Sequence, residues 1–162
     1  MAGAVKERRS IADYLDVSAT STADYALMGT GFTDLDESLA TKTTSKRYIN
    51  MASESKNVVG YDWSAPFTTD VIPDEKAVAF ICEIGEKEYT GAKAEADYVK
   101  VDLEKSAGGT TEFEARKRRV SVEVADFKSN DGEMQASGNL LGKTDWIPGK
   151  FDTATKIFTP EA

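Results

Sequence analysis

The sequence predicts a mainly β protein, an antiparallel β-sandwich or barrel flanked by one α-helix. Short stretches of alternating apolar and polar residues recur along the chain, which is typical of half-buried strands. Turn signals separate them at intervals of about 8–12 residues. Apolar residues repeat with the helical period in one segment only. The 162 residues fit one domain, residues 1–162, and we find no internal repeat or linker.

The first third of the chain predicts an arm followed by two strands. Residues 1–10 are polar and charged, which favours a flexible N-terminal arm. Residues 12–18 alternate in the manner of a short strand, and residues 23–32 form a second such run. Three acidic side chains within 33–38 match no calcium-loop spacing, so we interpret this segment as a solvated turn.

The next segment combines good strand sequences with a polar gap. A strand is predicted from about Thr41 to Met51, because Thr-rich sequence disfavours a helix. Residues 57–67 predict another, with Val59, Tyr61 and Trp63 on one face and a bulge at Gly60. The stretch between them, residues 52–57, is polar and lacks a tight turn signal. We therefore treat residues 34–59 as an extended loop or arm.

One helix is predicted within residues 68–89. Thr69 or Asp70 is the candidate N-cap, and Pro73 suits the first turn. Gly85 or Gly91 marks the end. The apolar stripe should pack against a sheet, and it consists of Ala77, Val78, Ile81, Cys82 and Ile84.

The last 65 or so residues predict consecutive antiparallel strands. Two runs alternate cleanly, around 97–105 and 118–127, and residues 106–111 connect them. An Asp-Gly hairpin turn is predicted at 129–133. Pro148–Gly149 is predicted as a turn, followed by two short closing strands around 151 and 157–158, with residues 153–162 as a C-terminal tail. The outward rows of the two cleanest strands are Lys100, Asp102 and Glu104, and Arg119, Ser121 and Glu123.

Composition argues against several classes of function. The chain has no histidine and one cysteine, and its net charge is −8. A protein that holds nucleic acid by neutralising phosphates needs the opposite charge. Without histidine or a nucleophile motif we predict no catalytic residues, no metal ligands and no cofactor. The basic residues of 116–119 alternate between the faces of a strand, so we expect salt bridges rather than a phosphate site.

The chain resembles the phage major tail proteins, the tail tube proteins of long non-contractile tails. Three stretches carry the resemblance: "KRYIN" (46–50) followed after a polar gap by "VVGYDWSAPF" (58–67), "TTDVIPDEKAVAFICEI" (68–84), and the C-terminal pattern from "RKRRVSVEVADF" to "GKFD". The departure from the family is the charged exit of the helix, "GEKEYTGAKAE".

The resemblance implies a tail-tube fold, shared with the tube proteins of contractile tails and type VI secretion. It also implies hexameric rings that stack into a hollow tube, assembled in the host cytoplasm and located in the virion. The implied partners are further copies of the chain and the tail completion, tape-measure and tip proteins. DNA would pass through the lumen without specific binding, and no membrane is implied. Six copies at −8 each carry about −48, which would repel DNA from the wall.

Two sets of residues follow as candidate assembly residues. Ala52, Ser53, Glu54, Ser55, Lys56 and Asn57 are predicted to contact a neighbouring subunit or ring, because polar arms gain order when a partner pairs with them. One of the two outward rows given above is predicted to face the lumen.

Two rival hypotheses remain open at this stage. The first is the inner tube protein of a contractile phage tail, a tailocin or a type VI secretion system, which would carry a sheath. The second is a monomeric ligand-binding β-sandwich with a concave aromatic patch around Tyr61, Trp63 and Trp146. An enzyme is the weakest of the functions that we considered.

Overall fold

The structure, a computed structural model, describes residues 3–18 and 21–161. Its strands are β1 (Ile11–Asp16), β2 (Tyr25–Leu27), β3 (Phe32–Leu35), β4 (Lys42–Lys46), β5 (Ser55–Gly60), β6 (Ser64–Asp70), β7 (Glu95–Ser106), β8 (Glu112–Asn130), β9 (Glu133–Gly142), β10 (Ile147–Asp152) and β11 (Ile157–Pro160). The helix α1 spans Lys76–Glu86, and two 3-10 turns, η1 (Arg8–Ser10) and η2 (Gly91–Ala94), complete the described elements.

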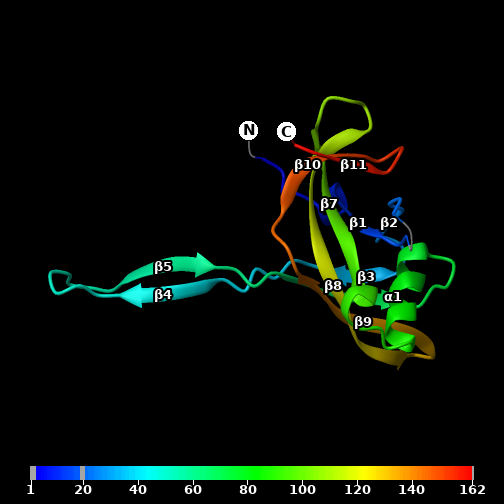
Figure 1. The fold of residues 1–162 in the computed structure, drawn as a ribbon, viewed down its shortest axis with the longest axis horizontal. Coiled ribbons are helices and arrows are strands. Elements are labelled where there is room, and N and C mark those ends of the chain that lie inside the picture. Colours follow the sequence, from blue (N-terminus) through cyan, green and yellow to red (C-terminus); the bar gives the residue numbers. More distant parts are fainter. Residues whose placement is uncertain (1–2, 19–20, 162) are drawn as a thin grey trace.

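The predicted fold class is confirmed: a curled antiparallel sheet forms a half-barrel with one helix beside it (Figure 1). The strand order is β2-β1-β7-β8-β9-β6-β3, and β10 pairs with both β8 and β11. The long strand β8 joins two parts of the sheet. Its first half pairs with β10 and its second half with β9, while β7 lies along its other side.

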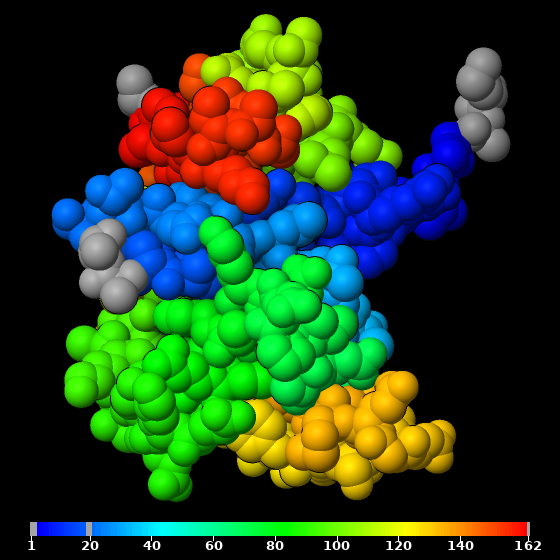
Figure 2. All heavy atoms as spheres, turned by 90° about the vertical axis from the view of Figure 1, so that its right-hand side faces the viewer, coloured from blue at the N-terminus to red at the C-terminus, as the bar shows by residue number. Residues whose placement is uncertain are grey.

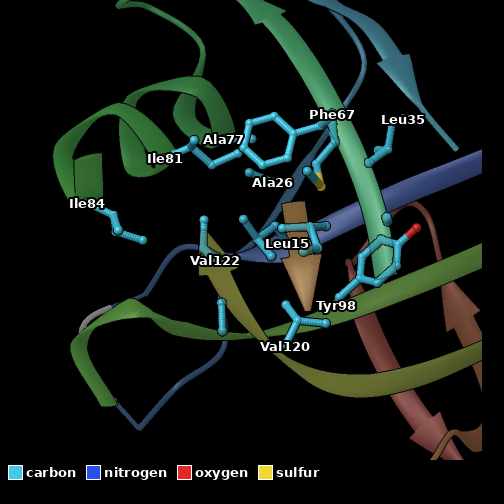
Figure 3. Close-up of a cluster of buried hydrophobic side chains, with 14 of the residues drawn as sticks. Leu15, Ala26, Leu35, Phe67, Ala77, Ile81, Ile84, Tyr98, Val120 and Val122 are labelled. Atoms are coloured by element: carbon cyan, nitrogen blue, oxygen red, sulfur yellow. The ribbon is translucent and has the colours of Figure 1, made fainter. Parts of the chain in front are cut away.

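The sheet buries side chains on both of its faces. Tyr98 and Val99, neighbours on β7, are both fully buried but lie in different apolar clusters, since adjacent residues of a strand point to opposite faces. The larger cluster packs the inner face of the sheet against α1 (Figure 3). Its labelled members include Leu15, Phe67, Ile81, Tyr98 and Val122. The smaller cluster joins β1 and β7 to Phe151 of β10.

The helix packs as its apolar stripe predicted, but it begins later. Ala77, Val78, Ile81, Cys82 and Ile84 are all buried. Thr69 and Asp70, the predicted caps, belong to β6, because pairing with β9 continues to Asp70. Glu75 stands at the N-cap without a side-chain hydrogen bond. Gly85 lies in the last turn, where a Cβ would come within 2.8 Å of Val124 and Phe127, so the glycine permits close packing on β8.

The hairpin predicted at 129–133 is confirmed. Asn130 pairs with Glu133, and the two residues between them, Asp131 and Gly132, have φ angles of 52° and 86°. Positive φ at both central positions is the geometry that Asp-Gly favours in a tight hairpin. The connection at 106–111 is also where the sequence predicted it. The bulge predicted at Gly60 lies at the neighbouring Val59, since Lys42 pairs with Gly60 and Thr43 with Val58.

Two further local predictions were wrong. Pro148–Gly149 is not a turn: both residues lie in β10, and the chain turns instead at 153–156. Pro148 stands near the start of the strand, where a missing N–H is tolerated, and Gly149 allows close approach to β11, since a Cβ would lie 2.3 Å from the Thr159 carbonyl oxygen. Val59 and Tyr61 do not share a buried face with Trp63, because the chain leaves its hairpin at Gly60 and only Trp63 enters the body.

We predict that Gly138→Ala destabilises the fold strongly. Its Cβ would lie 1.9 Å from the carbonyl oxygen of Glu123 on β8, so backbone must move. Overpacking costs about 1–3 kcal/mol of unfolding free energy, and a clash with backbone belongs at the upper end of that range, which urea denaturation can measure. Gly60→Ala, where a Cβ meets nothing within 4 Å, is the matched control. Equal stability of the two variants would contradict the close contact between β8 and β9.

Candidate assembly interface

A hairpin arm, residues 42–60, projects from the body of the molecule (Figure 1). It consists of β4, a turn and β5, which form a two-stranded sheet separate from the main one. Every residue of β4 is exposed. In β5 the two end residues, Ser55 and Gly60, are partly buried, and the four residues between them are exposed. A lone two-stranded hairpin is marginally stable in water. The arm therefore lacks the apolar packing that would stabilise it within one chain.

The arm carries exposed apolar side chains. Tyr48 is 60% exposed, Ile49 is fully exposed, and Val58 and Val59 are also exposed. Tyr48 and Ile49 lie in the turn at the tip, which closes with a 3.0 Å hydrogen bond from Met51 N–H to the Tyr48 carbonyl. Val58 and Val59 lie instead near the base of the arm, where Val58 pairs with Thr43, so exposed apolar side chains stand at both ends of the hairpin.

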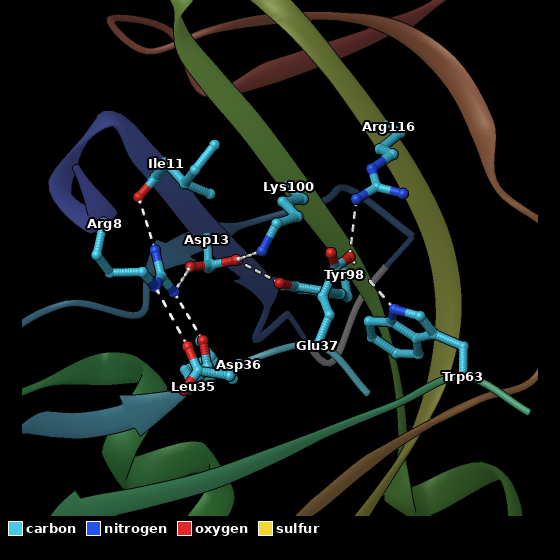
Figure 4. A network of polar contacts seen from close by, with 10 residues as sticks. All are labelled: Arg8, Ile11, Asp13, Leu35, Asp36, Glu37, Trp63, Tyr98, Lys100 and Arg116. Atoms are coloured by element: carbon cyan, nitrogen blue, oxygen red, sulfur yellow. Dashed lines mark hydrogen bonds and ion pairs between the residues drawn. The ribbon is translucent and has the colours of Figure 1, made fainter. Parts of the chain in front are cut away.

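The base of the arm, in contrast, is fixed to the body. Glu37 precedes the arm and Trp63 follows it, and the Trp63 indole N–H donates to Glu37 Oε1 at 3.2 Å (Figure 4). Arg116 of β8 donates to the same oxygen at 2.8 Å. Backbone bonds between Ser38 and Ser64, of 2.7 and 2.9 Å, join the two sides. Glu37, predicted as part of a solvated turn, thus holds both ends of the arm together.

The aromatic residues next to the base of the arm, Trp63, Trp146 and Tyr98, pack against one another and do not line an open binding surface. Trp63 lies 5.3 Å from Trp146 and 5.7 Å from Tyr98, centroid to centroid. The guanidinium of Arg118 stacks on both tryptophans at 4.7 and 4.9 Å, and that of Arg116 lies 4.2 Å from Trp146. Tyr61 is exposed outside this group. The patch that the ligand-binding hypothesis requires is therefore covered by two arginines.

A buried polar network links the N-terminal segment to the same region (Figure 4). Asp13, only 2% exposed, accepts hydrogen bonds from the Tyr98 hydroxyl, from Arg8 at 2.5 Å and from Lys100 at 3.4 Å. Arg8 also donates to the Leu35 carbonyl at 2.9 Å. Burial, and then the negative charge of Asp13, raise the pKa of Tyr98 well above its usual value. The residues before Arg8 have no regular structure from Gly3 on, and Met1 and Ala2 of the predicted arm lie outside the described residues.

The two rows predicted as lumen-facing lie on opposite faces of the sheet. Lys100 and Asp102 share the face of Tyr98, whereas Arg119 and Ser121 lie on the other, because Val120 and Val122 point toward the core with Tyr98. Lys100 is engaged with Asp13, and Lys6 reaches Asp102 at 2.6 Å and Glu104 at 3.5 Å. In the other row, Arg119 forms ion pairs with Glu95 and Asp97, as expected for this basic run, and Glu123 accepts a bond from Asn139. At most one row can therefore face a lumen.

The residues predicted to contact neighbours lie in the arm. Ala52, Ser53 and Glu54 form part of the turn, and Ser55, Lys56 and Asn57 begin β5. The sequence did not predict the tip residues Lys46–Ile49 as contact residues, although Tyr48 and Ile49 expose large apolar side chains there. Their signal was an apolar Tyr-Ile pair with no expected partner within the chain.

The projecting arm is shorter than predicted. The segment 34–59 includes Asp34 and Leu35, which pair with β6 in the body. Of the predicted tail, 157–160 form β11, and residue 162 lies outside the described range.

Over residues 3–18 and 21–161, no group of three or more His, Cys, Asp or Glu side chains is arranged to hold a metal ion. None of the helices in that part of the chain has the length and apolar character needed to span a bilayer.

No family model and no curated protein matches the chain. Among solved structures, a chain of the anti-feeding prophage (AFP) baseplate, determined by cryo-EM with six-fold symmetry, matches with a TM-score of 0.49 and 9% identity. The match covers 91% of this chain and 96% of that one.

We predict that Tyr98→Phe flattens the loss of stability at alkaline pH. The folded state keeps the Tyr98 hydroxyl protonated above pH 10, whereas the unfolded state ionises near pH 10, so stability falls as the pH rises. A tyrosine that stays protonated in the folded state lowers the free energy of unfolding by up to about 1.4 kcal/mol for each pH unit above 10. Urea denaturation between about pH 9.5 and 11.5 measures the slope. Tyr61→Phe, at an exposed position, should leave it unchanged; an identical effect of both substitutions would contradict the prediction.

Proposed function

We propose that this protein is a structural subunit that self-assembles into the tube of a phage tail of the long, non-contractile type. Rings of six copies stack into a hollow conduit through which DNA is ejected. The hairpin arm carries this proposal, because its exposed apolar residues and fixed base suit insertion into a neighbouring copy. The family resemblance of segments 46–50 and 58–67, which include the tip and the end of the arm, supports it.

The edges of the half-barrel offer a second kind of contact. β2, β3 and β11 each pair on one side only in the described sheet. Unpaired edges tend to recruit further strands unless they are covered. In a ring, sheets of adjacent copies join at these edges, and the curl of each sheet contributes to a closed wall.

The charge of the chain suits a DNA conduit. At −8 per copy, a ring presents a field that repels phosphates, and passage without binding requires this sign. Asp102 and Glu104 on one face, or Glu123 on the other, are the acidic members of the two candidate lumen rows.

The contractile-machine hypothesis predicts the same subunit fold with a sheath docked outside. Co-purification of a sheath protein with this chain would support the contractile-machine hypothesis over a non-contractile tail. A monomeric ligand-binding protein is less favoured, because the guanidinium groups of Arg116 and Arg118 stack on the tryptophans that would bind the ligand.

We predict that shortening the arm abolishes assembly and leaves the body folded. In the variant, residues 45–56 are replaced by Asn-Gly, so that Thr44 and Asn57, which are paired in the native hairpin, are joined by a tight two-residue turn. The arm contributes no residue to the buried clusters, so the melting temperature should change little. Electron microscopy of the concentrated protein should show rings or tubes for the native chain and none for the variant.

The control lengthens another exposed connection, with two glycines inserted after Gly109, and should assemble normally. Normal tubes from the shortened variant would exclude the arm as the assembly element. A native chain that stays monomeric at every concentration, alone and with its tail partners, would overturn the proposed function.

A further inference from the structure

We propose that the face of the sheet turned away from α1 forms the wall along which DNA moves in the conduit. This face, which we call the outer sheet face, consists of alternate residues from Ser64 to Asp70 in β6 and from Glu133 to Leu141 in β9, with the β8 and β3 residues paired with them. Their neighbours along the strands point to the buried cluster on the other side. The inference rests on the proposed tube, and it selects the second candidate lumen row, which contains Glu123.

The outer sheet face is acidic. It carries one lysine, Lys128, and five carboxylates, a net charge of −4; the carboxylates are Asp34, Asp70, Glu123, Asp126 and Glu133. Among the described residues, only Asp126 of these five forms an ion pair, with Lys128 at 3.6 Å. Six copies at −4 each would present −24 to the inside of a ring. Charges that the chain's own lysines do not neutralise produce a field that repels phosphates.

Hydrogen bonds from β9 hold two of these carboxylates against the sheet. The side-chain amide of Asn139 donates to Glu123 on β8 at 2.9 Å, and that of Gln135 donates to Asp70 on β6 at 2.9 Å. Both bonds join directly paired residues of neighbouring strands. A side chain held in this way lies along the sheet and does not extend into a passage beside it, so the face is smooth as well as acidic.

The chain itself leaves the outer sheet face open. None of its side chains is buried, and its apolar members are Pro66 and Leu141, the latter 38% exposed. Antiparallel sheets commonly have one face on the core and one face in water. A water-filled conduit provides the environment that this polar face requires.

The rival row of Lys100, Asp102 and Glu104 belongs to a different surface. Lys100 and Asp102 line a cleft of about 680 Å³ beside β10 and β11. Four of the residues that line this cleft are basic and three are acidic, so their charges nearly cancel. Phosphates would not be repelled there, and a concave hollow with polar groups is typical of binding sites rather than of a smooth wall.

The surface around α1 is apolar where the outer sheet face is polar. Figure 2 shows this end of the molecule, with α1 at the surface beside the hairpin of β8 and β9. Val124 and Phe127 point to the α1 side and line a hollow of about 500 Å³ with Ile84 and Tyr89. Aromatic side chains can stack with exposed bases, and exposed apolar patches are typical of protein contacts. This side therefore suits a contact between proteins better than a wall that DNA passes.

The arginine of the selected row does not offset the acidic charge. The guanidinium of Arg119 pairs with Glu95 at 3.4 Å and with Asp97 at 3.3 Å, and Lys143 reaches Glu95 at 2.7 Å. These two cations and two carboxylates have no net charge together. The acidic excess of the row therefore begins at Glu123 and continues toward the β8–β9 hairpin.

Cysteine labelling of assembled tubes tests which face lines the lumen. Pro66→Cys places a thiol on the outer sheet face and Ala79→Cys places one on α1; both positions are exposed, and the native Cys82 is buried. Tubes are treated with a small maleimide, which diffuses into the conduit, or with a maleimide that carries a long poly(ethylene glycol) chain and is too large to enter. Pro66→Cys should react with the small reagent and lose its reaction with the large one, whereas Ala79→Cys should react with both. Unassembled subunits, in which both thiols react with both reagents, are the control.

The outcomes separate this inference from the proposed function. Reaction of Pro66→Cys in tubes with the large reagent, or its protection from both reagents, would overturn the inference and leave the tube intact. Selective protection of Lys105→Cys, at an exposed position in the cleft beside β10 and β11, would assign the lumen to the rival row. A native chain that forms no tubes would overturn the proposed function itself. If Pro66→Cys prevents assembly, Ser137→Cys, which exchanges one oxygen for sulfur, tests the same face.

Charge reversal tests the same assignment through DNA. Glu123→Lys, Asp126→Lys and Glu133→Lys together change the charge of the outer sheet face from −4 to +2. As free subunits, the variant should retain circular duplex DNA at low ionic strength, because lysines bind phosphates. Tubes of the variant should lose this retention, since a closed circle cannot thread a tube. Gel shift for the subunits and co-sedimentation for the tubes measure it, and circular dichroism confirms folding. Tubes that retain circular DNA as well as the free subunits do would place these residues on the outside and overturn the inference.

Discussion

The carboxylate of Glu37 determines how this protein presents its arm. It accepts bonds from Trp63 on the far side of the arm and from Arg116 in the sheet. Because Glu37 is largely shielded from solvent, removing one partner would leave a poorly compensated charge. The arm, which has no core of its own, is therefore held in a defined direction. A preorganised arm loses less conformational entropy on docking than a loose loop.

The rest of the body supports this base. Trp63 rests on Tyr98, whose hydroxyl bonds to Asp13, and Asp13 in turn holds Arg8. Strands β1, β7 and β8 thus contribute to one continuous arrangement of aromatic and charged groups. Residues on both sides of β7 are buried, so this arrangement lies on a strand that is packed on both faces. The arm contributes no residue to the buried clusters, so this arrangement fixes the base of the arm without enclosing its tip.

Local patterns predicted much of the fold. Alternation at 97–105, the helical stripe and the Asp-Gly turn depend on neighbouring residues only, and all three were correct. Pro148–Gly149 was wrong because the proximity of Thr159, which requires a glycine, is a tertiary fact. Thr69 and Asp70 were misplaced because pairing with β9 outweighed their capping preference. At the candidate interface, the polar stretch 52–57 drew attention to the arm, but the partners of Glu37 are 26 and 79 residues away. No local pattern could reveal them.

The uneven charge of the chain connects its two proposed tasks. A uniformly acidic subunit would repel both DNA and further copies of itself, so assembly would have to overcome a repulsion that grows with each copy added. In the proposed assembly the projecting arm would reduce this conflict, because residues 42–60 hold four basic residues and one acidic residue, a net charge of +3 against −11 for the remainder of the chain. In such an assembly the exposed apolar side chains of the arm, Tyr48, Ile49, Val58 and Val59, would gain from a neighbouring copy the packing that they lack within one chain.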